Sequence, residues 1–228
     1  RQWATPSQKI IGIHPGRGGA SKPWHLGGYR DLLGKLGLRS DITVVLMGGG
    51  AKEVELVEQL APYPANVVNR VDVPIADLLS DIAACDLFIG IDSGPMHIAS
   101  ACGIPIVYLA LNKRQKPAQW GPWRTPHITL RDHSACSIAC FPDRCPIEDC
   151  SLGVSAETVY DAAIALVFGT ALPATVAAQD DFVSSLGFLF EADSKLTTEL
   201  RQTGARIWTA NVAWSQAEFL KFITVRDI

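Results

Sequence analysis

A short segment after an apolar run combines the residue types of an anion-binding helix start. It follows Ile91 and reads Asp92-Ser93-Gly94-Pro95-Met96-His97. Asp92 or Ser93 can cap a helix, and Pro95 suits its first turn. The first turn of a helix has free N–H groups at the positive end of its dipole, and Gly94 lets a phosphate approach the backbone. The segment predicts a diphosphate site, with a capped turn that binds nothing as the alternative.

A glycine-rich turn follows the first apolar run of the chain. It extends from His14 to Lys22 and contains three glycines, the first of them Gly16. Arg17 and Lys22 on such a loop can reach an anion at a neighbouring strand end. A cation there would stabilise a departing diphosphate. A solvated surface loop is the alternative reading.

A third turn, Gly48-Gly49-Gly50, precedes a stretch with acidic residues. A carboxylate at this position, from Glu53 or Glu55, could accept hydrogen bonds from both ribose hydroxyls of a nucleotide. Either residue could instead lie in the first turn of a helix and only favour its dipole. Three glycine turns at strand ends on one edge of a sheet indicate a shared site more strongly than any one of them.

The elements that would position these turns alternate between short apolar runs and amphipathic stretches. The predicted strands are Ile10–His14, Ile42–Met47, Val67–Asn69, Leu87–Ile91 and Pro105–Leu109. The predicted helices are Gly27–Leu36, Ala51–Ala61, Ile75–Ala84, Pro95–Cys102 and Ser155–Phe168, the last capped by Ser155. The strands are apolar on both faces, as in a parallel sheet covered by helices. This alternation predicts an α/β fold with a Rossmann-like, doubly wound parallel sheet.

Composition sets the outer limits of the prediction. The chain has 228 residues, 48% of them apolar, and a net charge of −3, which favours a globular protein and no nucleic-acid partner. We expect a domain over residues 1–169 and a linker followed by a helical tail over 170–228. The apolar stretch Val159–Ala178 is interrupted, which disfavours a membrane span. Because Arg1 takes the place of an initiating Met, we expect a processed chain or a piece of a longer one.

The six cysteines fall into two groups. Cys85 and Cys102 lie in apolar runs and are expected to be small core residues. The other four cluster in a short loop: Cys136, Cys140, Cys145 and Cys150. Their spacing is wider than that of most zinc sites, so bound zinc, disulfides and free thiols all stay open, with reduced thiols favoured in a cytoplasmic protein.

Together these motifs resemble glycosyltransferase family 9, the lipopolysaccharide heptosyltransferases and their relatives. The resemblance is carried by HPG at 14–16, K-x-W at 22–24, IGIDSGPMHIASACGIPIV at 89–107 and WGP at 120–122. It implies the C-terminal half of a GT-B fold, which in this family binds the nucleotide-sugar donor, typically ADP-heptose. It covers about residues 9–168.

The resemblance also implies roles for single residues. Asp92, Ser93, Gly94 and His97 would surround the diphosphate and the sugar. Lys22 would stabilise the leaving group, and the ribose-binding acid maps to the region of Glu53. The remaining expected donor-binding residues are His14, Gly16 and Met96. The sequence departs from the family at Leu111–Arg114, which replaces a Gly-Pro-Thr turn.

The expected function is therefore that of the donor-binding domain of an inverting, metal-independent glycosyltransferase. The acceptor, a glycolipid or polysaccharide, and the catalytic base are expected on an N-terminal acceptor domain missing from this chain. A non-catalytic nucleotide-sugar binding or interaction module is the alternative; an epimerase with this fold is disfavoured by the DSGPMH motif. The family implies a cytoplasmic location, peripheral at the inner membrane.

Overall fold

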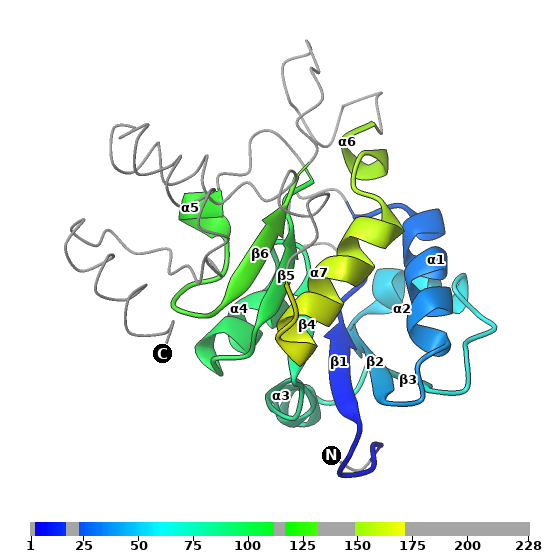
Figure 1. The fold of residues 1–228 in the computed structure, drawn as a ribbon. Helices are drawn as coiled ribbons and strands as arrows, with labels where there is room; N and C mark the ends of the chain where they lie inside the picture. The colour runs from blue at the N-terminus through cyan, green and yellow to red at the C-terminus, as the bar shows by residue number, and fades with distance from the viewer. Residues whose placement is uncertain (1–2, 17–22, 112–116, 132–148, 172–228) are drawn as a thin grey trace, which may run out of the picture.

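The computed structural model describes residues 3–16, 23–111, 117–131 and 149–171. They form a six-stranded parallel sheet covered by helices on both faces (Figure 1). The strands are β1 (Lys9–Ile13), β2 (Ile42–Gly48), β3 (Val67–Val71), β4 (Leu87–Gly90), β5 (Ile106–Leu109) and β6 (His127–Leu130). The helices are α1 (Leu26–Gly37), α2 (Ala51–Glu58), α3 (Ile75–Ala83), α4 (Gly94–Ala101), α5 (Pro117–Trp120), α6 (Asp149–Leu152) and α7 (Ala156–Phe168).

The strand order is β3-β2-β1-β4-β5-β6, and every neighbouring pair is parallel. From β1 the chain moves outward through β2 and β3, then returns to β4 on the other side of β1 and moves outward again. The order in which strands are added to the sheet therefore reverses between β1 and β4. Open α/β sheets bind their ligands at this point. The predicted doubly wound sheet is confirmed.

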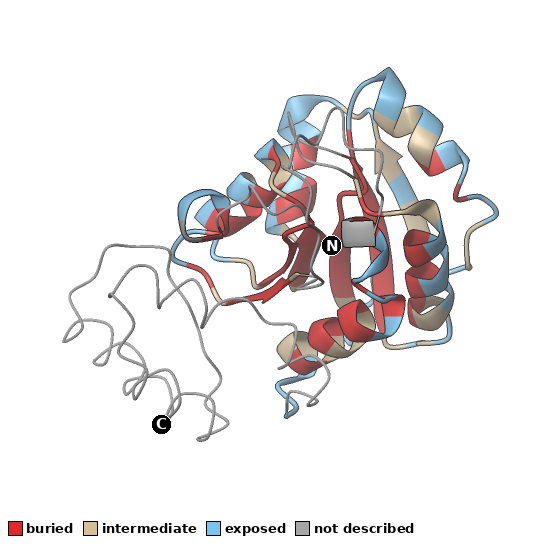
Figure 2. Cartoon of the chain, turned by 90° about the horizontal axis from the view of Figure 1, so that it is seen from above, coloured by how far each residue is buried: buried red, intermediate tan, exposed pale blue. Residues whose placement is uncertain are grey.

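Alternate strand residues fill two separate cores, one on each face of the sheet. Ile11 and Ile13 of β1 pack toward α1, α2 and α7, whereas Ile10 packs toward α3 and α4. The side chains of β1, β2 and β4 are almost completely buried, as the colouring of Figure 2 shows. This two-sided burial is why the strands read as continuous apolar runs.

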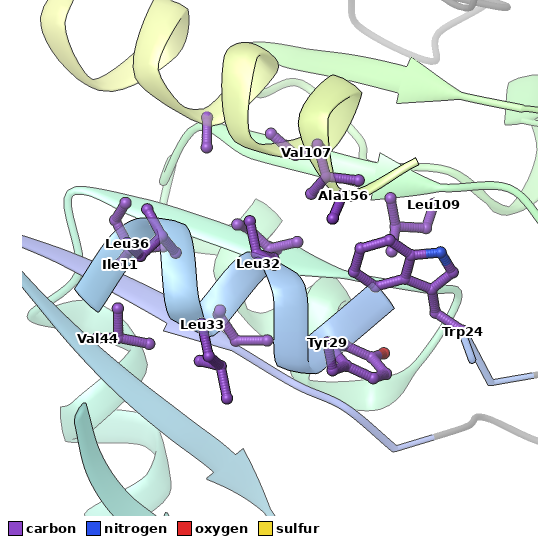
Figure 3. Close-up of a cluster of buried hydrophobic side chains, with 14 of the residues drawn as sticks. Ile11, Trp24, Tyr29, Leu32, Leu33, Leu36, Val44, Val107, Leu109 and Ala156 are labelled. Atoms are coloured by element: carbon purple, nitrogen blue, oxygen red, sulfur yellow. The ribbon is translucent and has the colours of Figure 1, made fainter. Parts of the chain in front are cut away.

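The first and the last described long helices meet over the first core. Trp24, just before α1, is buried and donates its Nε1–H to the carbonyl of Val154, just before α7, at 2.9 Å. Its ring also contacts Tyr29 edge to face, with centroids 5.0 Å apart (Figure 3). Lys35, in the last turn of α1, forms an ion pair with Glu157 in the first turn of α7.

The predicted strands and long helices end within three residues of the observed ends; the largest difference is in α2, which ends at Glu58 and was predicted to end at Ala61. Ser155 caps α7 as predicted, because its side chain accepts the N–H of Thr158 at 3.1 Å. Strand β6 and the short helices α5 and α6 were not predicted. Cys85 is buried as predicted, but the prediction for Cys102 was wrong: it caps the C-terminus of α4 and is exposed.

Several predictions fall outside the described residues. They concern Lys22, the loop with Cys136, Cys140 and Cys145, and the tail beyond residue 171; the side chain of Cys150 is also not described. Within the described ranges, the helices are too short or too polar to cross a membrane.

Candidate functional site

The loop after β4 forms the start of α4 as the sequence predicted. Ser93 has an extended backbone and is the N-cap, and its Oγ accepts the N–H of Met96 at 3.4 Å. Pro95 lies in the first turn. A Cβ built on Gly94 would meet no atom within 4 Å, so there is open space beside the backbone where the sequence predicts a phosphate. Pro95 has no N–H and the N–H of Met96 is bound by Ser93, so the N–H of Gly94 remains at the positive end of the helix dipole.

Asp92 and His97 form a pair at this helix start. His97 Nε2 lies 3.3 Å from Asp92 Oδ1. The His97 side chain is 47% exposed and that of Asp92 is 24% exposed. Both groups are therefore accessible to a ligand.

Met96 is placed differently from its neighbours. Its side chain is fully buried in the core beneath α3 and α4, and its N–H is bound by Ser93. Met96 therefore supports the helix start by packing, and donor binding by this residue stays a prediction.

Tyr108 of β5 is a site neighbour that the sequence did not indicate. Burial, together with the negative charge of Asp92, raises the pKa of the Tyr108 phenol well above its usual range. Its buried hydroxyl makes no hydrogen bond to any described residue. Tyr108 therefore stays protonated, as an O–H group close to Asp92. A tyrosine inside an apolar run gives no sequence signal other than core packing.

A second part of the site lies at the ends of β1 and β2. His14 follows β1, is 2% exposed, and places its Nε2 3.1 Å from Oε2 of Glu53. The same Glu53 oxygen accepts the N–H of Gly49 at 2.7 Å. Asp72, after β3, accepts the N–H of Gly50 at 3.1 Å. The glycine turn after β2 is thus held by two carboxylates.

The environment of Glu53 favours its charged form. Burial would raise the pKa of this carboxyl, but the hydrogen bond and charge of His14 and the N–H of Gly49 outweigh burial and leave the pKa below its ordinary value. Glu53 lies in the first turn of α2, where a negative charge also suits the helix dipole. The structure therefore shows the first of the two readings from the sequence, a carboxylate in the first turn of a helix, and ribose binding by Glu53 stays a prediction.

Gly16 and Gly48 leave the space that Glu53 occupies. A Cβ on either residue would collide with the Glu53 carboxylate. Gly50, with φ of 94°, adopts a backbone conformation that other residues avoid. The Glu53 carboxylate therefore requires glycine at position 16 in the first turn and at position 48 in the third.

The two parts of the site meet at the centre of the sheet. The backbone N–H of His14 donates to the carbonyl of Ile89 in β4, at 3.0 Å. His14, Gly16 and Glu53 thus follow β1 and β2, while Asp92, Ser93 and His97 follow the adjacent β4. Across the described ranges, no cluster of three or more His, Cys, Asp or Glu side chains has a metal-binding arrangement.

Comparison with known proteins identifies a family for this chain. The model of one family, described as glycosyltransferase family 9 (heptosyltransferase), matches residues 1–150, more than half of the 228-residue chain. The chain belongs to glycosyltransferase family 9. The match includes every predicted site residue, Lys22 among them.

Individual proteins are similar to part of the chain. Lipooligosaccharide heptosyltransferase 2 from Campylobacter jejuni is 29% identical over 149 residues, which are 62% of this chain and 45% of that protein. A protein from Haemophilus influenzae described as a putative glycosyltransferase is 33% identical over 126 residues, 52% of this chain and 35% of that protein. The chain spans less than half the length of these curated relatives.

Solved structures show the same fold. A family 9 glycosyltransferase from Veillonella parvula superposes with a TM-score of 0.61 at 25% identity, covering 73% of this chain and 48% of that one. The ADP-heptose lipopolysaccharide heptosyltransferase II of E. coli gives 0.59 at 23% identity, covering 72% and 48%. These neighbours are GT-B glycosyltransferases, so the Rossmann-like α/β fold class is confirmed.

Proposed function

We propose that this chain binds the nucleotide-sugar donor of an inverting glycosyltransferase of lipopolysaccharide core biosynthesis, with ADP-heptose as the donor. The observation that supports it most is the meeting of two features across β1 and β4. An open helix start with Asp92 and His97 follows β4, and an ionised, partly accessible Glu53 pairs with His14 at the end of the adjacent β1. A nucleoside diphosphate has a matching set of groups, namely an anion and a ribose with two hydroxyls.

Each feature has a distinct task in this proposal. The N–H groups at the start of α4 bind the diphosphate and stabilise its charge as the sugar departs. Lys22, predicted on the loop after β1, adds a cation at the leaving group. Asp92 and His97 contact the sugar end, and Glu53 contacts the ribose.

The second substrate belongs to a second domain in this proposal. A hydroxyl of a glycolipid or polysaccharide attacks the sugar from the face opposite the diphosphate, and a base must deprotonate it there. We assign both the acceptor and the base to an acceptor domain across a cleft. The names of the relatives, which are heptosyltransferases of lipooligosaccharide and lipopolysaccharide, support this substrate class. The working location is the cytoplasmic face of the inner membrane, with peripheral association.

Calorimetric titration of the chain with ADP, UDP, GDP and CDP tests the donor role. We expect saturable binding of ADP, weakened by about 1–3 kcal/mol in His97→Ala and Lys22→Ala, as for the loss of a charged contact. Lys35→Ala is the matched control, because Lys35 pairs with Glu157 at the far end of α1. Absence of binding by all four nucleotides would contradict the donor role and favour an interaction module.

The proposal includes binding without a metal ion. The start of α4 and Lys22 would stabilise the phosphate charge without help from a metal ion. ADP affinity is therefore expected to be the same in EDTA and in buffer with added Mg²⁺, and a loss in EDTA would contradict this part.

A further inference from the structure

The Glu53 carboxylate is held through one of its two oxygens. Oε2 lies 3.1 Å from His14 Nε2 and 2.7 Å from the N–H of Gly49. Two donors on one carboxylate oxygen occupy both of its lone-pair directions. A further hydrogen bond to the same oxygen would have to displace one of them.

The other oxygen, Oε1, is open. It accepts no hydrogen bond from any residue of the described ranges. It lies against Gly16, where a Cβ would collide with it. The Glu53 side chain is 18% exposed, whereas that of His14 is 3% exposed. The pair therefore has a buried, fixed end and an accessible end.

The unpaired nitrogen of His14 indicates how the proton is placed. His14 Nδ1 is buried and has no hydrogen-bond partner among the described residues. A proton on Nδ1 would leave a buried N–H without an acceptor, which costs more than a bare ring nitrogen. The tautomer with the proton on Nε2 is thus favoured, and His14 donates that proton to Glu53.

We propose that His14 is a positioning residue that makes Glu53 selective for a single ribose hydroxyl. By engaging Oε2, His14 fixes the carboxylate and leaves Oε1 as the only acceptor for the ligand. Because Gly16 packs against one side of Oε1, only the other side of this oxygen is left for the ligand, and Glu53 accepts a hydrogen bond from either the 2′- or the 3′-hydroxyl, and not from both. This inference rests on the proposed nucleotide-binding function.

Of the titratable groups in the described ranges, His14 after β1 and Tyr29 of α1 interact with Glu53. Burial, and secondarily the charge of Glu53, raises the pKa of Tyr29 far above its usual range, so Tyr29 stays neutral. The contacts that fix the Glu53 carboxylate therefore come from His14 and from the N–H of Gly49.

Calorimetry with ADP, 2′-deoxy-ADP and 3′-deoxy-ADP tests the selectivity. In the wild-type chain we expect one deoxy nucleotide to bind about tenfold more weakly than ADP and the other to bind within about threefold of it. If both deoxy nucleotides bind equally more weakly than ADP, Glu53 accepts hydrogen bonds from both ribose hydroxyls, and the proposal is overturned.

Two variants of His14 separate positioning from packing. His14→Gln keeps an N–H at the reach of Nε2, whereas His14→Leu removes the donor at similar bulk. We expect His14→Gln to keep the discrimination between ADP and the weaker deoxy nucleotide and His14→Leu to lose it. Discrimination that survives in His14→Leu would overturn the proposal.

A measurement without nucleotide keeps the two proposals distinguishable. NMR can follow the titration of the Glu53 carboxyl and the hydrogen exchange of the Gly49 amide. In His14→Leu, and not in His14→Gln, the pKa of Glu53 should rise and the Gly49 amide should exchange faster. Unchanged values in His14→Leu would overturn the positioning role. Failure of ADP to bind the wild type would instead contradict the donor function.

Discussion

His97 Nε2 and Asp92 Oδ1 lie 3.3 Å apart across the first turn of α4, and both side chains are accessible. A carboxylate at a helix start is favourable by itself but repels a phosphate bound there. This suggests that Asp92 serves the sugar and not the phosphates, with His97 holding its orientation.

Asp92→Asn is therefore expected to affect two ligands in opposite directions. ADP should bind equally well or more tightly, because a negative charge next to the diphosphate is gone. ADP-heptose should bind more weakly by about 1.5–3 kcal/mol, the usual effect of losing a hydrogen bond to a charged group. Competition calorimetry measures both affinities, and parallel losses for ADP and ADP-heptose would contradict the assignment.

Ser93→Ala should lower both stability and ligand affinity. Loss of the N-cap hydrogen bond to Met96 costs about 1 kcal/mol in the free energy of unfolding, and fraying of the helix start would weaken diphosphate binding. Ser155→Ala is the matched control, because Ser155 caps α7 in the same way. Urea denaturation should show similar destabilisation in both variants, with ADP affinity reduced only in Ser93→Ala.

Gly94→Ala separates ligand binding from folding. A Cβ at this position has open space around it, and alanine is favoured over glycine in a helix, so the variant should be at least as resistant to urea as the wild type. The methyl group would occupy the space predicted for phosphate, and ADP affinity should fall at least about tenfold, equivalent to about 1.4 kcal/mol. Unchanged ADP affinity would place the phosphate elsewhere.

The charge of Glu53 should make stability depend on pH. Its pKa in the folded chain lies below the ordinary value of 4.5, so the folded state holds the proton less tightly than the unfolded chain. The resulting stabilisation is complete above the unfolded pKa and is lost as the pH falls through the folded pKa. Urea denaturation between pH 6 and 3 should show a smaller loss of stability on acidification in Glu53→Gln than in the wild type.

Much of the fold could be predicted because β1, β2 and β4 are buried on both faces and read as apolar runs. Strand β6 was not predicted, because two of its four residues, His127 and Thr129, are polar. Both are buried, but the segment does not have the continuous apolar pattern of the central strands. Burial of Cys102 was predicted wrongly, because an apolar stretch of sequence does not show which residue of a helix faces solvent.

The site was only partly predictable. The start of α4 is encoded in consecutive residues, so Ser93 as cap and Gly94 as open position could be anticipated. His14 and Glu53 were predicted separately, but their contact spans 39 positions and depends on the register of β1 beside β2, with Ile13 opposite Leu46. The proximity of Tyr108 to Asp92 depends in the same way on β5 lying beside β4.

The contact between Trp24 and Val154 has a consequence for the order of synthesis. The two residues are 130 positions apart, and Ala156, Val159 and Ala163 of α7 cover the same core as Leu32 and Leu36 of α1. While the ribosome is still adding the strands, α1 has no α7 to pack against, and its apolar side is open to water and to other nascent chains. The domain can close only after residue 168 has left the exit tunnel, so its exposure to chaperones lasts for most of its translation.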